Sequence, residues 1–330
     1  MSDKYGRRPL LVTSIAGTAI SFFMAAWAPS AIFLFIARAL DGLTAGNIPV
    51  AAAVISDSTE AKDRAKGFGI IGASFGFGFA VGPAISAFTI PYGIHVPFII
   101  AGVISTIATI LTWAFLPETN KHIGEVKKGK LFDFAKLFHM LFDPQVGRTL
   151  LISLVYSFTF GLFIFGFQPF AVKGMMLSAN EISVIYTIFG IVGLISQIVL
   201  LPRVTKLFSD KRALEGSLLL ASVAFLGLFF VTQLIPFVII SIMLGLANSF
   251  VNPLVQTILS KETDDKSQGS IQGLNASYIS IGTIFGPIIG GALTRFSIST
   301  PFLLGAVGAI ISFALSLHVM KLGKHKESAF

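Results

Sequence analysis

Ten mainly apolar stretches, each close to the 20 or so residues that a helix needs to cross a bilayer, follow one another along this chain. Of the 330 residues, 54% are hydrophobic and only 12% are charged, which is more apolar surface than a water-soluble domain of this length can bury. The sequence therefore predicts an all-α polytopic membrane protein. The predicted spans are residues 10–28, 31–56, 67–90, 97–116, 149–171, 180–201, 213–232, 235–259, 269–294 and 299–320.

Alternate loops between these spans carry most of the basic residues. Because loops rich in Lys and Arg stay in the cytoplasm, both termini are expected there, with the protein in the cell (plasma) membrane. A nucleic-acid partner is not expected, since it would require a basic stripe on one folded face rather than dispersed loops. The loops on this side hold 21 of the 24 Lys and Arg, in residues 1–9, 57–66, 117–148, 202–212, 260–268 and 321–330.

The two halves of the chain repeat one another at an offset of 204 residues. A shared Gly-x-x-x-Gly-Pro and a shared Pro-Phe fall in one register without gaps. Parallel repeats of this kind characterise secondary transporters with a binding site near mid-bilayer. The aligned pairs include Pro49 with Pro253, Gly78 with Gly282, Gly82 with Gly286, Pro83 with Pro287, and Pro97 with Pro301.

The repeat also predicts a plan of six plus six helices, of which four plus six are present. The spans at 149–171 and 180–201 precede the segment at Ser209, whose first-half partner begins at Ser2. Their own counterparts would lie before Met1. The expected organisation is a truncated N-terminal bundle (helices 3–6 of the plan), a cytoplasmic central loop and a C-terminal six-helix bundle, at residues 1–116, 117–148 and 149–330.

A basic segment at the start of the chain carries a family resemblance. The run Ser2-Asp3-Lys4-Tyr5-Gly6-Arg7-Arg8-Pro9 resembles the latter part of the G-x-L-A-D-R-x-G-R-R signature of the major facilitator superfamily, without its opening Gly-x-Leu. The resemblance implies the major facilitator fold and a gate in which the acid pairs with a helix end and nearby cations. The plain alternative is a basic turn that obeys the charge rule. The implied gating residues in this segment are Asp3, Gly6, Arg7 and Arg8.

Two ionisable side chains, Arg38 and Asp41, lie deep in a predicted span. Their segment is similar to the Arg-x-x-Asp-Gly of the superfamily's tetracycline and multidrug antiporters, which implies a part in proton coupling. Charges inside a membrane are costly and mark functional sites, and a spacing of three places both on one helical face. Asp41 is the expected titrating group, because the pKa of arginine is too high. A buried ion pair that only fixes helix register is the alternative.

Glycine-rich ridges mark one helix in each half. The second-half copy matches the G-x-x-x-G-P-x-x-G-G hallmark of antiporter members, and the first-half copy is degenerate. Small residues allow close helix packing and proline allows a bend, so both packing and gating roles are open. The candidates are Gly78, Gly82 and Pro83, and Gly282, Gly286 and Pro287.

Neutral polar side chains within the spans suit a broad cavity for a drug-like molecule, with hydrogen bonding between helices as the alternative. The predicted substrate-binding residues are Asn47, Tyr156, Gln168, Tyr186, Gln197, Asn248, Asn252 and Asn275.

The resemblance implies a secondary active transporter that exports a lipophilic, drug-like solute in exchange for protons by alternating access. An uptake symporter of the same superfamily and an inactive truncated remnant, or a gene fragment with a mis-called start, are the alternatives. An enzyme is not expected, because the sequence has no Cys and no clustered acids or His, and no catalytic or metal-binding residue is assigned. The expected partners are the lipid bilayer, a small-molecule substrate and protons. The proton gradient takes the place of a cofactor, and the chain is expected to be a monomer.

Overall fold

The computed structural model describes residues 5–58, 74, 77–78, 81–120, 138–263 and 268–319, in which all regular elements are helices. The predicted gating residue Asp3 lies outside these residues. The chain divides into two compact units, residues 1–130 and 131–330, and the division falls within the predicted central loop.

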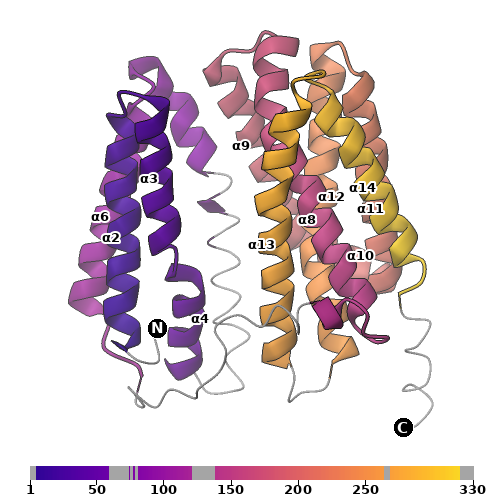
Figure 1. Ribbon diagram of the computed structural model, residues 1–330, viewed down its shortest axis with the longest axis horizontal. Coiled ribbons are helices and arrows are strands. Elements are labelled where there is room, and N and C mark those ends of the chain that lie inside the picture. Colours follow the sequence, from indigo (N-terminus) through magenta and orange to yellow (C-terminus); the bar gives the residue numbers. More distant parts are fainter. Residues whose placement is uncertain are drawn as a thin grey trace. The chain divides into compact units, whose positions relative to one another are not determined.

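Unit 1 is built around its first long helix, α2. Helix α2 packs against α6 and α3 and also contacts α4 (Figure 1). Residues 81–89 are helical and lead into a short 3₁₀ turn, η1. The elements are α2 (Arg7–Ala26), α3 (Ala31–Thr44), α4 (Asn47–Ser58), η1 (Ile90–Tyr92) and α6 (Val96–Phe115).

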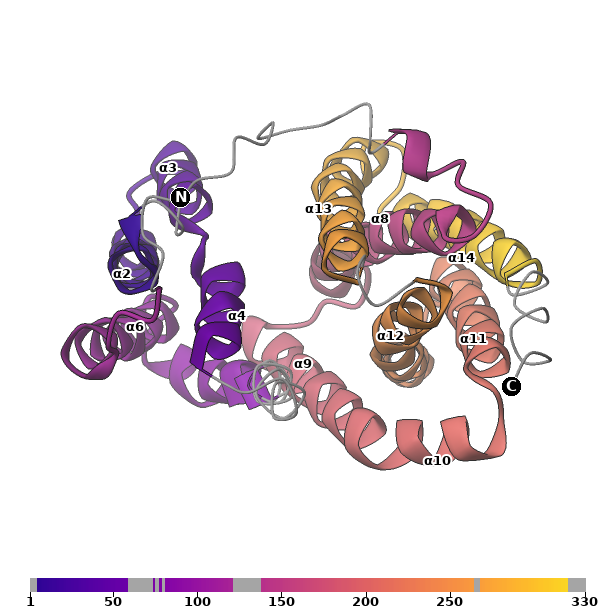
Figure 2. The same ribbon diagram turned by 90° about the horizontal axis from the view of Figure 1, so that it is seen from below.

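Unit 2 is a helical bundle, seen nearly end-on in Figure 2. Helix α13 packs along α8, and α11 packs against both α12 and α14. Helix α8 ends in a π turn, η2, and a second π turn, η3, joins α9 to α10. The elements are α8 (Gly147–Pro169), η2 (Phe170–Gly174), α9 (Ala179–Ile195), η3 (Ser196–Leu200), α10 (Leu201–Leu207), α11 (Asp210–Phe230), α12 (Leu234–Glu262), α13 (Gln268–Leu293) and α14 (Thr300–Ser316).

Serine side chains mark the starts of several helices. Ser30 Oγ accepts the backbone N–H of Phe33 at the start of α3, and Ser178 forms a capping box with Glu181 at the start of α9. Such bonds satisfy backbone donors that have no partner within the helix. The polar residues of the short loops therefore fix where each span begins.

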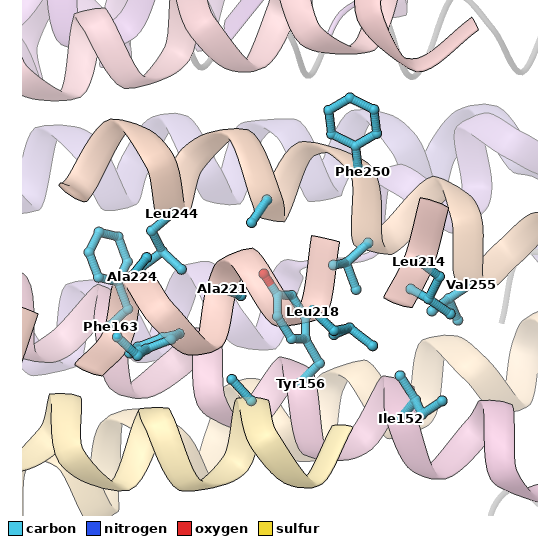
Figure 3. Packing of buried hydrophobic residues seen from close by; sticks show 14 of the residues in the cluster. Ile152, Tyr156, Phe163, Leu214, Leu218, Ala221, Ala224, Leu244, Phe250 and Val255 are labelled. Carbon is cyan, nitrogen blue, oxygen red and sulfur yellow. The ribbon is translucent and has the colours of Figure 1, made fainter. Parts of the chain in front are cut away.

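The interior of unit 2 is a continuous apolar core. Aromatic and aliphatic side chains of α8, α11 and α12 interdigitate there, with Phe163, Leu218 and Leu244 fully buried (Figure 3). Large apolar residues such as Phe35 and Ile235, each 73% exposed, cover the outside of the helices. Apolar side chains both inside and outside are what a bundle dissolved in lipid requires. The chain is a multi-pass membrane protein.

Seven helices in the described residues are long and apolar enough to cross a membrane, and α14 is a shorter apolar helix. The structure differs from the prediction at residues 31–56, which were expected to form one helix. This span is divided into α3 and α4 by Ala45 and Gly46. At the 204-residue offset its counterpart is α12, which continues without interruption from Leu234 to Glu262.

Candidate functional site: an ion pair, two charged ends and a cavity

The predicted pair on α3 is formed. Arg38 Nη1 lies 3.5 Å from Asp41 Oδ2, and the two side chains are 41% and 29% exposed. Arg38 Nη2 also donates a hydrogen bond to Ser21 Oγ on α2, at 2.9 Å, and the guanidinium lies 5.0 Å from the ring centre of Phe22. Helix α2 therefore orients the arginine, and the partly exposed carboxylate of Asp41 is open to a proton or solute.

Asn47, a predicted substrate-binding residue, is the first residue of α4, directly after the interruption of the span. Its half-buried side chain accepts the N–H of Ile48 at 2.9 Å. The broken backbone next to it is held from α2, where Ser14 Oγ donates to the carbonyl oxygen of Thr44 at 2.5 Å and accepts the N–H of Gly46 at 3.0 Å. Ser14 was not predicted from the sequence, although Gly46 and Pro49 in an apolar span are signals of a break.

Charged side chains gather at one end of unit 1, where α2 begins and α4 and α6 end; this is called the charged end of unit 1. Arg7 Nε lies 3.1 Å from Asp57 Oδ2 on α4, and Arg8 donates to the carbonyl oxygen of Trp113 on α6. Two of the predicted gating residues, Arg7 and Arg8, thus tie α2 to α4 and α6.

The carboxylate of Glu118 covers the start of α2. It accepts the N–H groups of Arg7 at 2.9 Å and Arg8 at 3.1 Å. Partial burial raises the pKa of Glu118, but hydrogen bonds from the backbone of Asn120, Arg7, Arg8 and Thr119 outweigh it, and the pKa lies below its ordinary value. Gly6, at φ 96°, passes so close to this carboxylate that a Cβ there would collide with it. Sequence spacing gave no signal for this contact.

Unit 2 has an equivalent charged end, where α11 begins and α12 and α14 end. Lys211 Nζ donates to the carbonyl oxygen of Leu317 at 3.2 Å, and Leu317 is the repeat counterpart of Trp113. Lys261 on α12 forms an ion pair with Asp210 on α11, at 2.6 Å. Each charged end therefore joins the same three repeat-equivalent helices.

The second-half glycine ridge brings α13 into backbone contact with α8. A Cβ on Gly282 would lie 2.6 Å from the backbone nitrogen of Phe158, and one on Gly286 would lie 2.6 Å from the carbonyl oxygen of Phe158. A Cβ on Gly161 would likewise lie 3.0 Å from Cδ of Pro287 in the same seam. In the first half, Gly78, Gly82 and Pro83 are helical, and none of the described residues lies within 4 Å of a Cβ added to either glycine.

A cavity of about 610 Å³ opens between α8 and α13 at the other end of unit 2. Gln168, a predicted substrate-binding residue, lines it together with Lys173 of the π turn η2. Lys173 was not predicted as a site residue, although it is one of few cations far from the basic loops. The remaining lining residues, mostly apolar, are Ile164, Phe165, Pro169, Val172, Pro287, Thr294 and Ile298.

The other predicted substrate-binding residues are not gathered at this cavity. Tyr156 Oη, visible in Figure 3, is buried without a hydrogen-bond partner among the described residues, as are Asn248 Oδ1 and Asn275 Oδ1. The ring of Tyr186 lies 4.8 Å from that of Phe167, centre to centre. Gln197, on η3, and Asn252, on α12, are exposed.

Comparisons with known proteins agree with this architecture. The family model described as "Major Facilitator Superfamily" matches residues 1–178 and 149–330. The chain is 31% identical to multidrug resistance protein 1 of Bacillus subtilis, covering 96% of this chain and 80% of that protein. It is 30% identical to tetracycline resistance protein, class C, of Escherichia coli, covering 91% and 76%. The crystal structure of the human organic anion transporter MFSD10 superimposes with a TM-score of 0.73 at 20% identity, covering 96% and 78%.

Proposed function

Since this chain belongs to the Major Facilitator Superfamily and is a membrane transporter of that family, we propose that it exports a lipophilic, drug-like solute in exchange for protons. Its curated relatives are named as resistance proteins for multiple drugs and for tetracycline, which supports export of such compounds. The two units would alternate access to the solute, with the proton gradient as the source of energy and no cofactor. The working unit is a monomer in the cell membrane, with both termini in the cytoplasm.

The observation that carries the proton coupling is the ion pair on α3. A carboxylate inside a membrane segment is stable either as an ion paired with a cation or as a neutral, protonated group. It can therefore bind a proton when it leaves its cation. Asp41 forms a salt bridge with Arg38, and Arg38 is also held by Ser21. Protonation of Asp41 would release it from Arg38 without freeing the arginine. This is the behaviour required of a coupling acid beside a fixed cation.

The cavity between α8 and α13 supports a solute of mixed character. A volume of about 610 Å³ falls in the range of small-molecule sites, and mostly apolar walls with a few polar groups are typical of them. Gln168 supplies a donor and an acceptor, and Lys173 a positive charge. We expect this cavity to hold the solute at one stage of the cycle.

Transport in liposomes tests the proposal. The purified chain is reconstituted, a pH gradient is imposed, and movement of a fluorescent lipophilic dye and of tetracycline is followed with and without a protonophore. We expect gradient-driven movement of the dye and its loss in Asp41→Asn. The control is Glu215→Gln, which changes an acid near the start of α11 and should keep this movement. Gradient-driven transport at the normal rate in Asp41→Asn would remove Asp41 from the coupling. Movement of the solute in the same direction as protons would favour a symporter.

A further inference from the structure

The interruption between α3 and α4 is specific to the first half of the repeat. At the 204-residue offset, the segment from Ala31 to Ser58 corresponds to residues 235–262, which lie in the uninterrupted helix α12. The two segments start and end at equivalent positions. The break is therefore not a general property of this position in the fold.

The neighbouring helix α2 is adapted to the break. Ser14, which is 3% exposed, bonds both the carbonyl oxygen of Thr44 and the N–H of Gly46. Gly17, one turn along α2, makes room for Thr44, because a Cβ at Gly17 would collide with the Thr44 side chain. The N–H of Gly46 also bonds the carbonyl oxygen of Thr44, at 2.7 Å. Since backbone groups in lipid need partners within the protein, the two hydrogen bonds of Ser14 add to the stability of the interruption.

Unit 2 offers a natural comparison. The counterparts of Ser14 and Gly17 on α11 are Leu218 and Ala221, both fully buried and apolar. Neither can hydrogen-bond a broken backbone or receive a displaced threonine, and the helix beside them is continuous. The two adaptations, a hydroxyl and a missing Cβ, occur together with the break and are absent together from the described counterpart.

The break lies between two groups of charges. Helix α3 carries Arg38 and Asp41, and α4 carries Asp57, which is paired with Arg7 at the charged end of unit 1. A span without continuous backbone hydrogen bonds at its middle bends there at low cost. We propose that residues 45–46 are a hinge and that Ser14 is the positioning residue that holds it, letting α4 move at the charged end while α3 keeps its ion pair. The link to transport rests on the proposed function; the hinge itself does not.

Spin-label distances test the hinge without a transport assay. The chain has no cysteine, so spin labels attach only to cysteines that are introduced, here Ile32→Cys on α3 and Ser58→Cys on α4. If α3 and α4 formed one continuous helix, these two positions would lie about 40 Å apart. Pulsed EPR in liposomes should give a broad distance distribution, against a narrow one for the Ile235→Cys and Ser260→Cys pair on α12. Ser14→Leu with Gly17→Ala introduces the unit 2 residues, which do not accommodate a break. This double variant should therefore narrow and shift the distance distribution of the pair on α3 and α4. A distribution unchanged by these substitutions would overturn the proposal.

Three further variants separate positioning from a loss of folding. Ser14→Ala removes the hydroxyl without adding bulk and should also narrow the distance distribution. Ser14→Thr keeps the hydroxyl and should restore the broad distribution of the unaltered chain. Thr13→Ala is the matched control, because Thr13 is exposed and its hydroxyl donates to the carbonyl oxygens of Pro9 and Leu10 within α2. Ser14→Thr behaving as Ser14→Ala would contradict a role for the hydroxyl.

Dye transport then connects the hinge with function. We expect gradient-driven transport to fall roughly tenfold in Ser14→Ala and to recover in Ser14→Thr, within the 5–150-fold range of typical couplings. Normal transport in a Ser14→Ala chain whose distances have changed would show that the hinge has no part in the cycle. If the unaltered chain transports nothing but its distances respond to Ser14, the hinge stands and the proposed function fails.

Discussion

Asp57 on α4 and Lys261 on α12 occupy the same position in the two halves of the chain, yet they carry opposite charges. Asp57 pairs with Arg7 at the start of α2, and Lys261 pairs with Asp210 at the start of α11. In unit 1 the base lies on α2 and the acid on α4, whereas in unit 2 the acid lies on α11 and the base on α12. An ion pair joins the two helices in both units. This link between the helices is therefore what the fold requires at both charged ends.

A double-mutant cycle measures this link in unit 1. Arg7→Gln and Asp57→Asn should each lower stability, and the double variant should lose less than the sum of the two. We expect a coupling of about 0.2–1 kcal/mol, as for other ion pairs at a protein surface, since Asp57 is an exposed residue and Arg7 a half-buried one. The measurement is thermal unfolding in detergent at low salt. Strictly additive losses would show that the pair contributes nothing.

Glu118 should make unit 1 sensitive to acid. Its folded pKa lies below the ordinary value of 4.5, so its stabilising effect is complete above that value and is lost as the pH falls through the folded pKa. Glu118→Gln keeps the size of the side chain but weakens the bonds to the start of α2, at a cost of about 0.5–1 kcal/mol near neutral pH.

The pH dependence of the melting temperature checks this assignment. Between about pH 3 and pH 7, the curves of the parent and of Glu118→Gln should converge at the acid end, because the parent carboxyl is then protonated. A difference that stayed constant over the whole range would mean that the charge of Glu118 is not involved.

The spans and the pairing within one helix follow from local sequence, whereas contacts between helices do not. Hydropathy and short polar loops predicted the helices, and a spacing of three predicted that Arg38 meets Asp41. No spacing rule relates Ser21 to Arg38, Asp57 to Arg7 or Glu118 to the start of α2, since these contacts depend on how helices pack. The break after Thr44 was missed although Gly46 and Pro49 are local signals of one. Its stabilising partner, Ser14, could not be predicted, because Ser14 lies on another helix.

The seam between α8 and α13 should not tolerate a methyl group. Gly286→Ala would place a Cβ against the backbone of α8 and force the helices apart, at a cost of about 1–3 kcal/mol. Gly290→Ala on the same helix is the control, because its Cβ would meet side chains at 3.5 Å, an ordinary contact. Unfolding in a mixed-detergent series should separate the two variants. Equal stability would show that the seam can open without loss.

The cavity in unit 2 gives a test of solute binding that does not involve transport. Gln168 lines the cavity, whereas Gln197 is exposed on η3 and is not among the lining residues, so the two glutamines form a matched pair. Losing one hydrogen bond of about 1 kcal/mol should weaken dye binding roughly fivefold in Gln168→Ala and leave it unchanged in Gln197→Ala. Fluorescence anisotropy of the dye, titrated with the chain in detergent, measures both dissociation constants.

Lys173→Gln separates the roles of charge and shape, because it should weaken binding of an anionic dye more than that of a neutral one. If Gln168→Ala and Gln197→Ala bind the dye equally well, the solute binds elsewhere. The next groups to substitute are then the buried polar atoms of Tyr156 and Asn248, which have no hydrogen-bond partner in the part of the chain that the structure describes.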